Sequence, residues 1–196
     1  MAKRARRTRG LADVWRAVAE EDGGRVIERK LKPPLIELGS GPWVTRTDTM
    51  SDPSGSGSTL TRFRTPYLPT RPFRLRIAKR GLFDHVAAWV GAGGIRVGRA
   101  EFDRRFTVRA SGRGVARSLL LGTRLGERLL AQPDVRVELG KPGLRRRREL
   151  GPGVREAVVR YPRLLVDADE LREAFALSWE LVRELERVGV AKSTAP

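Results

Sequence analysis

The chain has 196 residues, enough for one domain with a sizeable core, and 40% of them are hydrophobic. It contains no cysteine, which excludes disulfides, thiolate nucleophiles and cysteine-based metal sites. Its 40 lysines and arginines outnumber 23 acidic residues, and the net charge of +17 favours polyanions such as nucleic acid as partners.

The two ends of the chain are polar. Residues 1–10 carry only basic charges and predict a disordered basic arm, while residues 190–196 predict a flexible tail. Asp13 and Arg16 interrupt the segment in which a secretion signal would need an apolar run. The longest uncharged stretch, residues 86–95, has about half the length of a membrane helix. These features predict a cytoplasmic protein without a membrane span.

One helix and a series of strands are predicted in the first half of the chain. The spacing of Leu11, Val14, Trp15 and Val18 is typical of an amphipathic helix, which Gly23 ends. Short runs of β-forming residues then predict a long hairpin loop at 50–59 and strands at 25–28, 35–38, 43–47, 60–67 and 73–79.

The second half of the chain mixes helices and strands. The patterns predict strands at 95–97, 102–109, 135–139 and 154–161, the last two forming a hairpin around a basic turn at 141–148, and helices at 115–121 and 125–130. Asp167 followed by Glu170 is typical of a helix N-terminus. An apolar stripe then predicts a long helix that ends at Gly189 and contains Leu171, Phe175, Trp179, Val182 and Leu185.

These elements predict one α+β domain over residues 11–189. Its sheet is expected to be mainly antiparallel, and the N-terminal helix, the middle helices and the long C-terminal amphipathic helix are expected to pack on it.

The basic segment 62–80 contains no acidic residue. Its arginines alternate with apolar residues, so they share one face of a sheet, where guanidinium groups can contact successive phosphates. A run of four arginines at 145–148 adds a second cationic element. The predicted function is a non-catalytic domain that binds a polyanion such as nucleic acid through Arg62, Arg64, Arg74, Arg76, Arg145, Arg146, Arg147 and Arg148. The alternative is that these arginines are only the solvated side of a half-buried sheet.

Two other classes of function stay open. The C-terminal helix could dock on a protein partner through Phe175 and Trp179. An enzyme would need carboxylates from loops or strands, and the spacing singles out no pair among Glu28, Glu37, Asp48, Asp84, Glu101 and Asp103.

Specific cofactor motifs are not found. The single histidine, His85, is too few for a multi-histidine metal site, and the glycines at 39–42 and 91–94 fit neither a phosphate-binding loop nor a dinucleotide fingerprint. No catalytic residue, metal or cofactor is therefore predicted.

The segment Glu101-Phe102-Asp103-Arg104-Arg105-Phe106-Thr107-Val108, followed by Ala116-Arg117-Ser118-Leu119-Leu120, resembles a bacterial family of proteins with a domain of unknown function. In that family a Phe-x-x-x-Phe strand precedes a Leu-rich helix. The resemblance covers approximately residues 73–161 and implies an α+β fold. It implies no activity and no functional residue for this chain.

Overall fold

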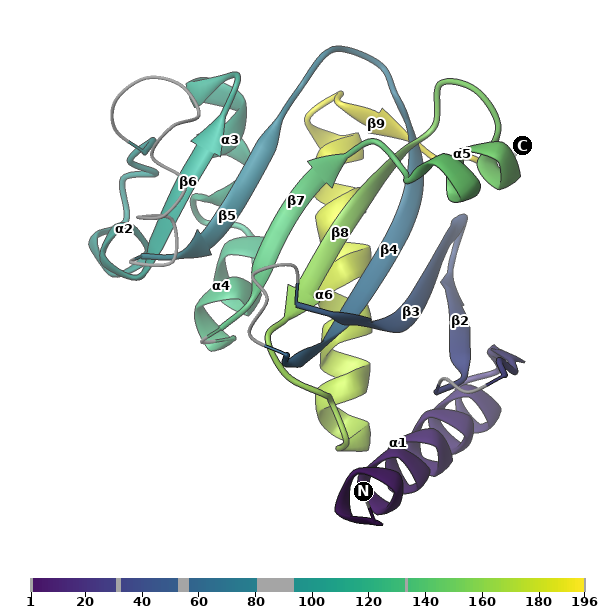
Figure 1. The fold of residues 1–196 in the computed structure, drawn as a ribbon. Coiled ribbons are helices and arrows are strands. Elements are labelled where there is room, and N and C mark those ends of the chain that lie inside the picture. The colour runs from purple at the N-terminus through teal and green to yellow at the C-terminus, as the bar shows by residue number, and fades with distance from the viewer. Residues whose placement is uncertain (1, 31–32, 53–56, 81–93, 133, 196) are drawn as a thin grey trace.

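An antiparallel sheet organises the chain in the computed structural model, which describes residues 2–30, 33–52, 57–80, 94–132 and 134–195 (Figure 1). The sheet has nine strands and, with the helices below, makes the predicted α+β domain. The strands are β1 (Arg25–Ile27), β2 (Leu35–Ser40), β3 (Trp43–Ser51), β4 (Thr59–Pro69), β5 (Leu75–Lys79), β6 (Phe106–Ala110), β7 (Arg136–Gly140), β8 (Arg155–Tyr161) and β9 (Ala191–Lys192).

The order of strands in the sheet is β1-β2-β3-β4-β8-β7-β5-β6, with β9 paired to the end of β4. The predicted β7–β8 hairpin is confirmed. It lies between β4 and β5, which follow each other in the sequence, so the chain from β4 to β5 crosses over the end of the sheet (Figure 1). The backbone of Thr70 in this crossing donates to Val190 (N···O 3.0 Å), and Arg71 Nη2 donates to the carbonyl of Val188 (2.6 Å).

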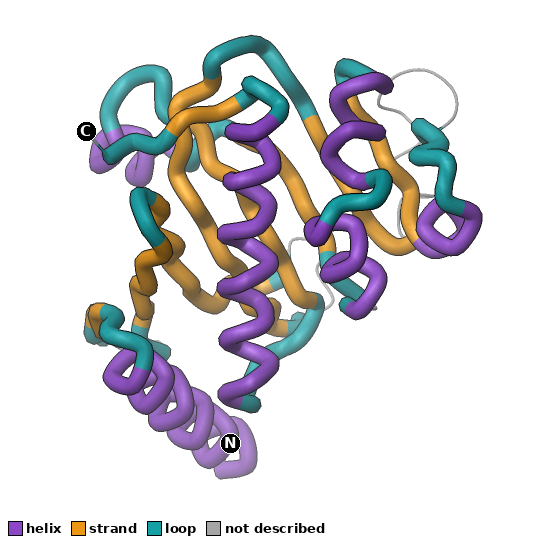
Figure 2. Tube along the Cα trace, turned by 180° about the vertical axis from the view of Figure 1, so that it is seen from behind, coloured by secondary structure: helices purple, strands orange, loops and turns teal. Residues whose placement is uncertain are grey.

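The helices lie mainly on one face of the sheet. They are α1 (Ala2–Glu21), α2 (Ala100–Arg105), α3 (Arg113–Leu120), α4 (Arg124–Ala131), α5 (Leu144–Leu150) and α6 (Ala168–Arg187). Figure 2 shows α6 running along the sheet with α3 and α4 beside it. The ring of Phe175 on α6 packs edge-on against Phe63 on β4, with centroids 5.0 Å apart. No described helix is long and apolar enough to cross a membrane.

Helix α1 is attached by its apolar stripe, as predicted. Leu11, Trp15 and Val18 are fully buried, and Trp15 Nε1 donates to the carbonyl oxygen of Leu165 at 3.0 Å, just before α6. The helix begins at Ala2, whereas a disordered arm was predicted for residues 1–10. The difference has a local reason, since alanine and arginine are good helix formers and can extend a helix that is docked further along.

Four other segments differ from the sequence predictions. Residues 95–97 form no strand and contribute only an isolated bridge between Ile95 and Val108. Residues 102–105 belong to α2 and not to a strand, because Asp103 accepts hydrogen bonds from the backbone of Val97 and Gly98 and fixes a turn there. Residues 144–150 form α5 and not a turn, with Arg146 and Glu149 paired one helical turn apart. The tail predicted to be flexible contains β9, because the left-handed conformation of Gly189 (φ 67°) returns the chain to β4.

Candidate anion-binding surface

The sheet has two chemically different faces. On β4, Phe63 and Tyr67 are buried and point toward α6, while the alternating residues Arg62 and Arg64 point to the opposite side. We call that opposite side the outer face. In Figure 1 it is turned toward the viewer, with α6 behind strands β7, β8 and β4.

Arginines form two rows across the outer face. The strand register aligns one row as Asp48, Arg62, Arg160 and Arg136, on β3, β4, β8 and β7. It aligns the second row, from β2 to β6, as Glu37, Arg46, Arg64, Val158, Glu138, Arg76 and Arg109. Neighbouring strands lie about 4.8 Å apart, so these charges are close enough to attract or repel one another directly.

In the β2–β4 half of the outer face, arginines pair with the buried Asp48 and the partly buried Glu37. Asp48, whose side chain is 7% exposed, accepts from Arg62 (Nε···Oδ1 2.9 Å, Nη2···Oδ2 2.8 Å) and from Arg64 (Nη2···Oδ2 2.9 Å). Burial lowers the pKa of Arg64, and the Asp48 carboxylate opposes that shift. Arg46 likewise donates to Glu37 at 2.6 Å. Arg62 and Arg64, which we predicted to be phosphate ligands, are held in this network.

Helix α5 divides the predicted run of four arginines. Arg146 is mostly buried and pairs with Glu156 on β8 (3.3 Å) and Glu149 (2.9 Å), so it fastens the helix to the sheet. Arg147 and Arg148 are exposed to solvent. The side chain of Arg145 is outside the described part of the structure.

The β8–β6 half of the outer face keeps an excess of positive charge. Glu138 accepts from Arg76 Nη2 (2.7 Å) and Arg160 Nη1 (2.8 Å). Burial raises the pKa of Glu138, but hydrogen bonds and charge from these two arginines outweigh it and hold the pKa below its ordinary value of 4.5. Among the described residues, Arg136 has no hydrogen bond or ion pair with another side chain. We call this cluster the Glu138 patch: Arg76, Arg109, Arg136, Arg160 and Glu138.

The structure thus brings together only part of the predicted set. Arg76 lies in the Glu138 patch, and the exposed Arg74 lies just before the start of β5. Arg109, Arg136 and Arg160 were missed. Each lies between two apolar or aromatic residues in the sequence, but only the register of β6, β7 and β8 places them near Arg76.

The apolar stripe of α6 is part of the core, which corrects the predicted docking role. Phe175 is fully buried between Phe63 and Trp179, and Trp179 is partly buried against it. A long helix needs to bury its apolar face somewhere, and here the sheet of the same chain covers it.

The candidate carboxylates do not meet in one place. Glu28 pairs with Arg16, Glu101 with Arg99, and Asp103 accepts from the backbone, whereas Glu37 and Asp48 belong to the outer face. Asp84 and His85 lie outside the described residues. Within the described residues, no group of three or more His, Asp or Glu side chains could hold a metal ion.

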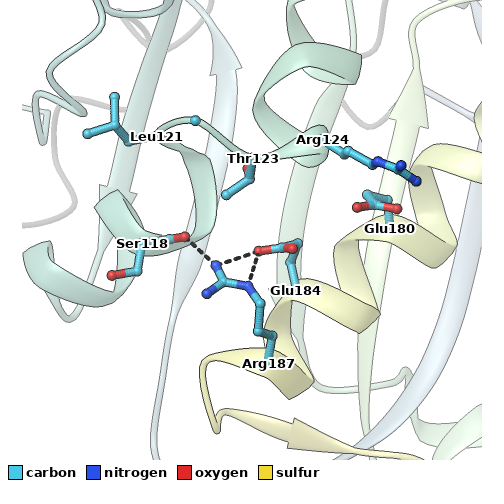
Figure 3. Close-up of a pocket in the computed structure, with 8 residues that line it drawn as sticks. Ser118, Leu121, Thr123, Arg124, Glu180, Glu184 and Arg187 are labelled. Atoms are coloured by element: carbon cyan, nitrogen blue, oxygen red, sulfur yellow. Dashed lines mark hydrogen bonds and ion pairs between the residues drawn. The ribbon is translucent and has the colours of Figure 1, made fainter.

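A hollow on the helical side has balanced charge. It lies between the α3–α4 turn and α6, and Figure 3 shows Arg187 donating to Glu184 (2.6 Å) and to the Ser118 carbonyl (2.6 Å). Arg124 and Glu180 also line it, so two acids face two bases. Such a surface has little preference for an anion or a cation.

No family model, curated protein or solved structure matches this chain. The distribution of charge over the two faces of the sheet is therefore the observation from which a function can be inferred.

Proposed function

We propose that this protein is a cytoplasmic, non-catalytic domain that binds a nucleic acid through the Glu138 patch. Four arginines lie on four adjacent strands of the outer face. Two of them, Arg76 and Arg160, share the single carboxylate of Glu138, and Arg136 has no partner among the described side chains. This excess of positive charge, on the sheet face opposite α6, is the observation that supports the proposal.

The chemistry of the patch suits phosphate groups. A guanidinium presents a planar fork of donors that fits two oxygens of one phosphate. Arginines on neighbouring strands form a flat array, which can follow a phosphate backbone over several residues. Contacts of this kind fix position and orientation but carry no base-sequence information. The proposed binding is therefore independent of sequence and sensitive to salt.

Base stacking has no support among the described strand residues. Trp43, Phe63, Tyr67 and Tyr161 all point into the core and are at most 3% exposed. Proteins that bind single strands through stacking present such rings at the surface. We therefore propose a duplex, held through its phosphates, as the preferred ligand.

Binding to a labelled 20-base-pair duplex, followed by fluorescence anisotropy at several salt concentrations, tests the proposal. If all four arginines of the patch meet phosphates, log affinity falls against log salt with a slope of about −3 to −4. Two duplexes of unrelated sequence should give the same affinity. Absence of binding, or an affinity insensitive to salt, would contradict the proposal.

A pair of charge-matched variants separates the patch from the net charge of the chain. Arg76→Gln with Arg160→Gln removes two charges from the patch and should make the slope less steep by about 2. Arg124→Gln with Arg128→Gln removes two charges from α4, on the helical side, and should leave the slope unchanged. Equal losses in both variants would show that binding follows net charge alone.

A further inference from the structure

Three arginines stand side by side in the first row of the outer face. Arg62 on β4 is directly opposite Arg160 on β8, which is directly opposite Arg136 on β7. Like charges at directly opposed positions destabilise a sheet unless an anion lies between them. The row contains one acid, Asp48. It lies at the end of the row away from Arg136 and forms ion pairs with Arg62 and Arg64.

The acids near Arg136 are occupied by other cations. Glu138, two residues along β7, accepts from Arg76 and Arg160. Asp134, two residues before Arg136, pairs with Lys79 at 3.1 Å. The Arg136 guanidinium therefore carries a charge that no described side chain balances.

Two arginines of this row, Arg136 and Arg160, are also short of hydrogen-bond acceptors. The Nε atoms of Arg136 and Arg160 are both buried without a partner. A guanidinium has five N–H donors, and donors withdrawn from water without an acceptor are costly. Burial of Nε indicates that each side-chain stem is packed against its neighbours, so the guanidinium ends are held in place. Glu138 additionally fixes Arg160 through Nη1.

From this geometry we propose that Arg136 and Arg160 form a discrete subsite for one phosphate group. The oxygens of the phosphate accept from the outer nitrogens of both arginines and place negative charge between them. The assignment of that phosphate to a nucleic-acid backbone rests on the proposed function above. The subsite itself takes the phosphate oxyanion, whether it belongs to a backbone or is free.

Thermal unfolding with inorganic phosphate tests the subsite without nucleic acid. At matched ionic strength, phosphate should raise the midpoint of the wild-type protein above that measured in chloride, because a ligand of the folded state stabilises it. Arg136→Gln should lose this rise, and Arg136→Lys, which keeps the charge but not the planar fork, should keep only part of it. Arg124→Gln, on α4, should respond like the wild type.

The unfolding midpoints of the same variants without phosphate show whether the substitution itself destabilises the fold. Because Arg136→Gln removes one of three neighbouring like charges, its midpoint without phosphate should equal or exceed that of the wild type. A lower midpoint in Arg136→Met, which keeps most of the packed stem but not the charge, would mean that the Arg136 guanidinium has a partner in the fold and would overturn the subsite. A phosphate effect that persists undiminished in Arg136→Gln would overturn it as well.

Duplex binding by Arg136→Gln identifies the source of the phosphate. A loss of about tenfold in affinity at 0.1 M salt, with a slope less steep by about 1, places the subsite under the backbone. An unchanged duplex affinity, with the phosphate effect lost, upholds the subsite for free phosphate. If the wild type binds phosphate but no duplex, the proposed function fails and the subsite stands. If the wild type gains no stability from phosphate, the subsite fails whatever the duplex does.

Discussion

Asp48 is the residue on which the β2–β4 half of the outer face depends. It is almost buried and holds two guanidinium groups. Asp48→Asn keeps the shape of the side chain and leaves Arg62 and Arg64 uncompensated, so we expect a loss of about 3 kcal/mol in the free energy of unfolding. Urea unfolding followed by circular dichroism measures it. Asp13→Asn removes an exposed partner of Arg16 and should leave the midpoint unchanged. Equal midpoints for the two variants would show that the Asp48 network adds no stability.

Glu138 should give stability an acid dependence. Its pKa is lower in the folded chain than the ordinary 4.5, so its contribution is fully present above that value and is lost as pH falls through the lowered pKa. Glu138→Gln should therefore reduce the fall in urea midpoint between about pH 5 and pH 3. Glu173→Gln, which removes an exposed partner of Arg128, is the matched control and should behave like the wild type. If Glu138→Gln has the wild-type pH dependence, other carboxyls carry the effect.

At the scale of elements, the N-terminus of α6 is capped by the side chain of Asp167. Asp167 accepts from the backbone of Asp169 and Glu170, both at 3.0 Å, and satisfies two donors that the helix cannot pair internally. Asp167→Ala should cost about 1 kcal/mol in urea unfolding. Asp169→Ala removes an acid from the same turn without removing the cap and should cost less. A larger loss in Asp169→Ala would assign the effect to charge near the helix end.

Elements with a strong local pattern could be predicted from the sequence. The strand that contains Phe63 is predictable because apolar residues recur every two residues along a strand. The helix that contains Phe175 is predictable because apolar residues recur every three to four residues along a helix. Helices α2 and α5 were not found. One depends on Asp103 binding the backbone, and the other on Arg146 reaching Glu156 across a strand. These contacts join residues six and ten positions apart, and neither follows the period of a helix or a strand.

At the scale of the whole molecule, the candidate site depends on pairings between distant segments. Alternation predicts that Arg62 and Arg64 share a face, but not that Asp48 meets both of them. Arg160 lies beside Arg62 only because β4 and β8 pair across nearly one hundred residues of sequence. A local pattern sets which face an arginine occupies, whereas register sets which charges surround it. The fold class was therefore predictable, while the Glu138 patch was not.

The insertion of β7 and β8 between β4 and β5 makes the first 131 residues an incomplete unit. A chain of residues 1–131 contains β4 and β5 but lacks the two strands that join them, as well as α6. We expect it to show no cooperative urea transition and to form large species in size-exclusion chromatography, because two strand edges and the core are exposed. A monomer that unfolds cooperatively would show that the N-terminal strands and helices are stable alone.

During synthesis, the same strand order delays completion of the sheet, because β4 and β5 cannot be joined until β7 and β8 have been made. The β1–β4 part and the β5–β6 hairpin emerge from the ribosome as separate pieces, and nothing joins their inner edges until Tyr161 has been added. At ordinary rates of translation the interval from the end of β5 to that point is about 4 to 16 seconds. We expect the arginines on β4, β5 and β6 (Arg62, Arg64, Arg76 and Arg109) to act at this stage as well, because like charges on open strands disfavour pairing between nascent chains.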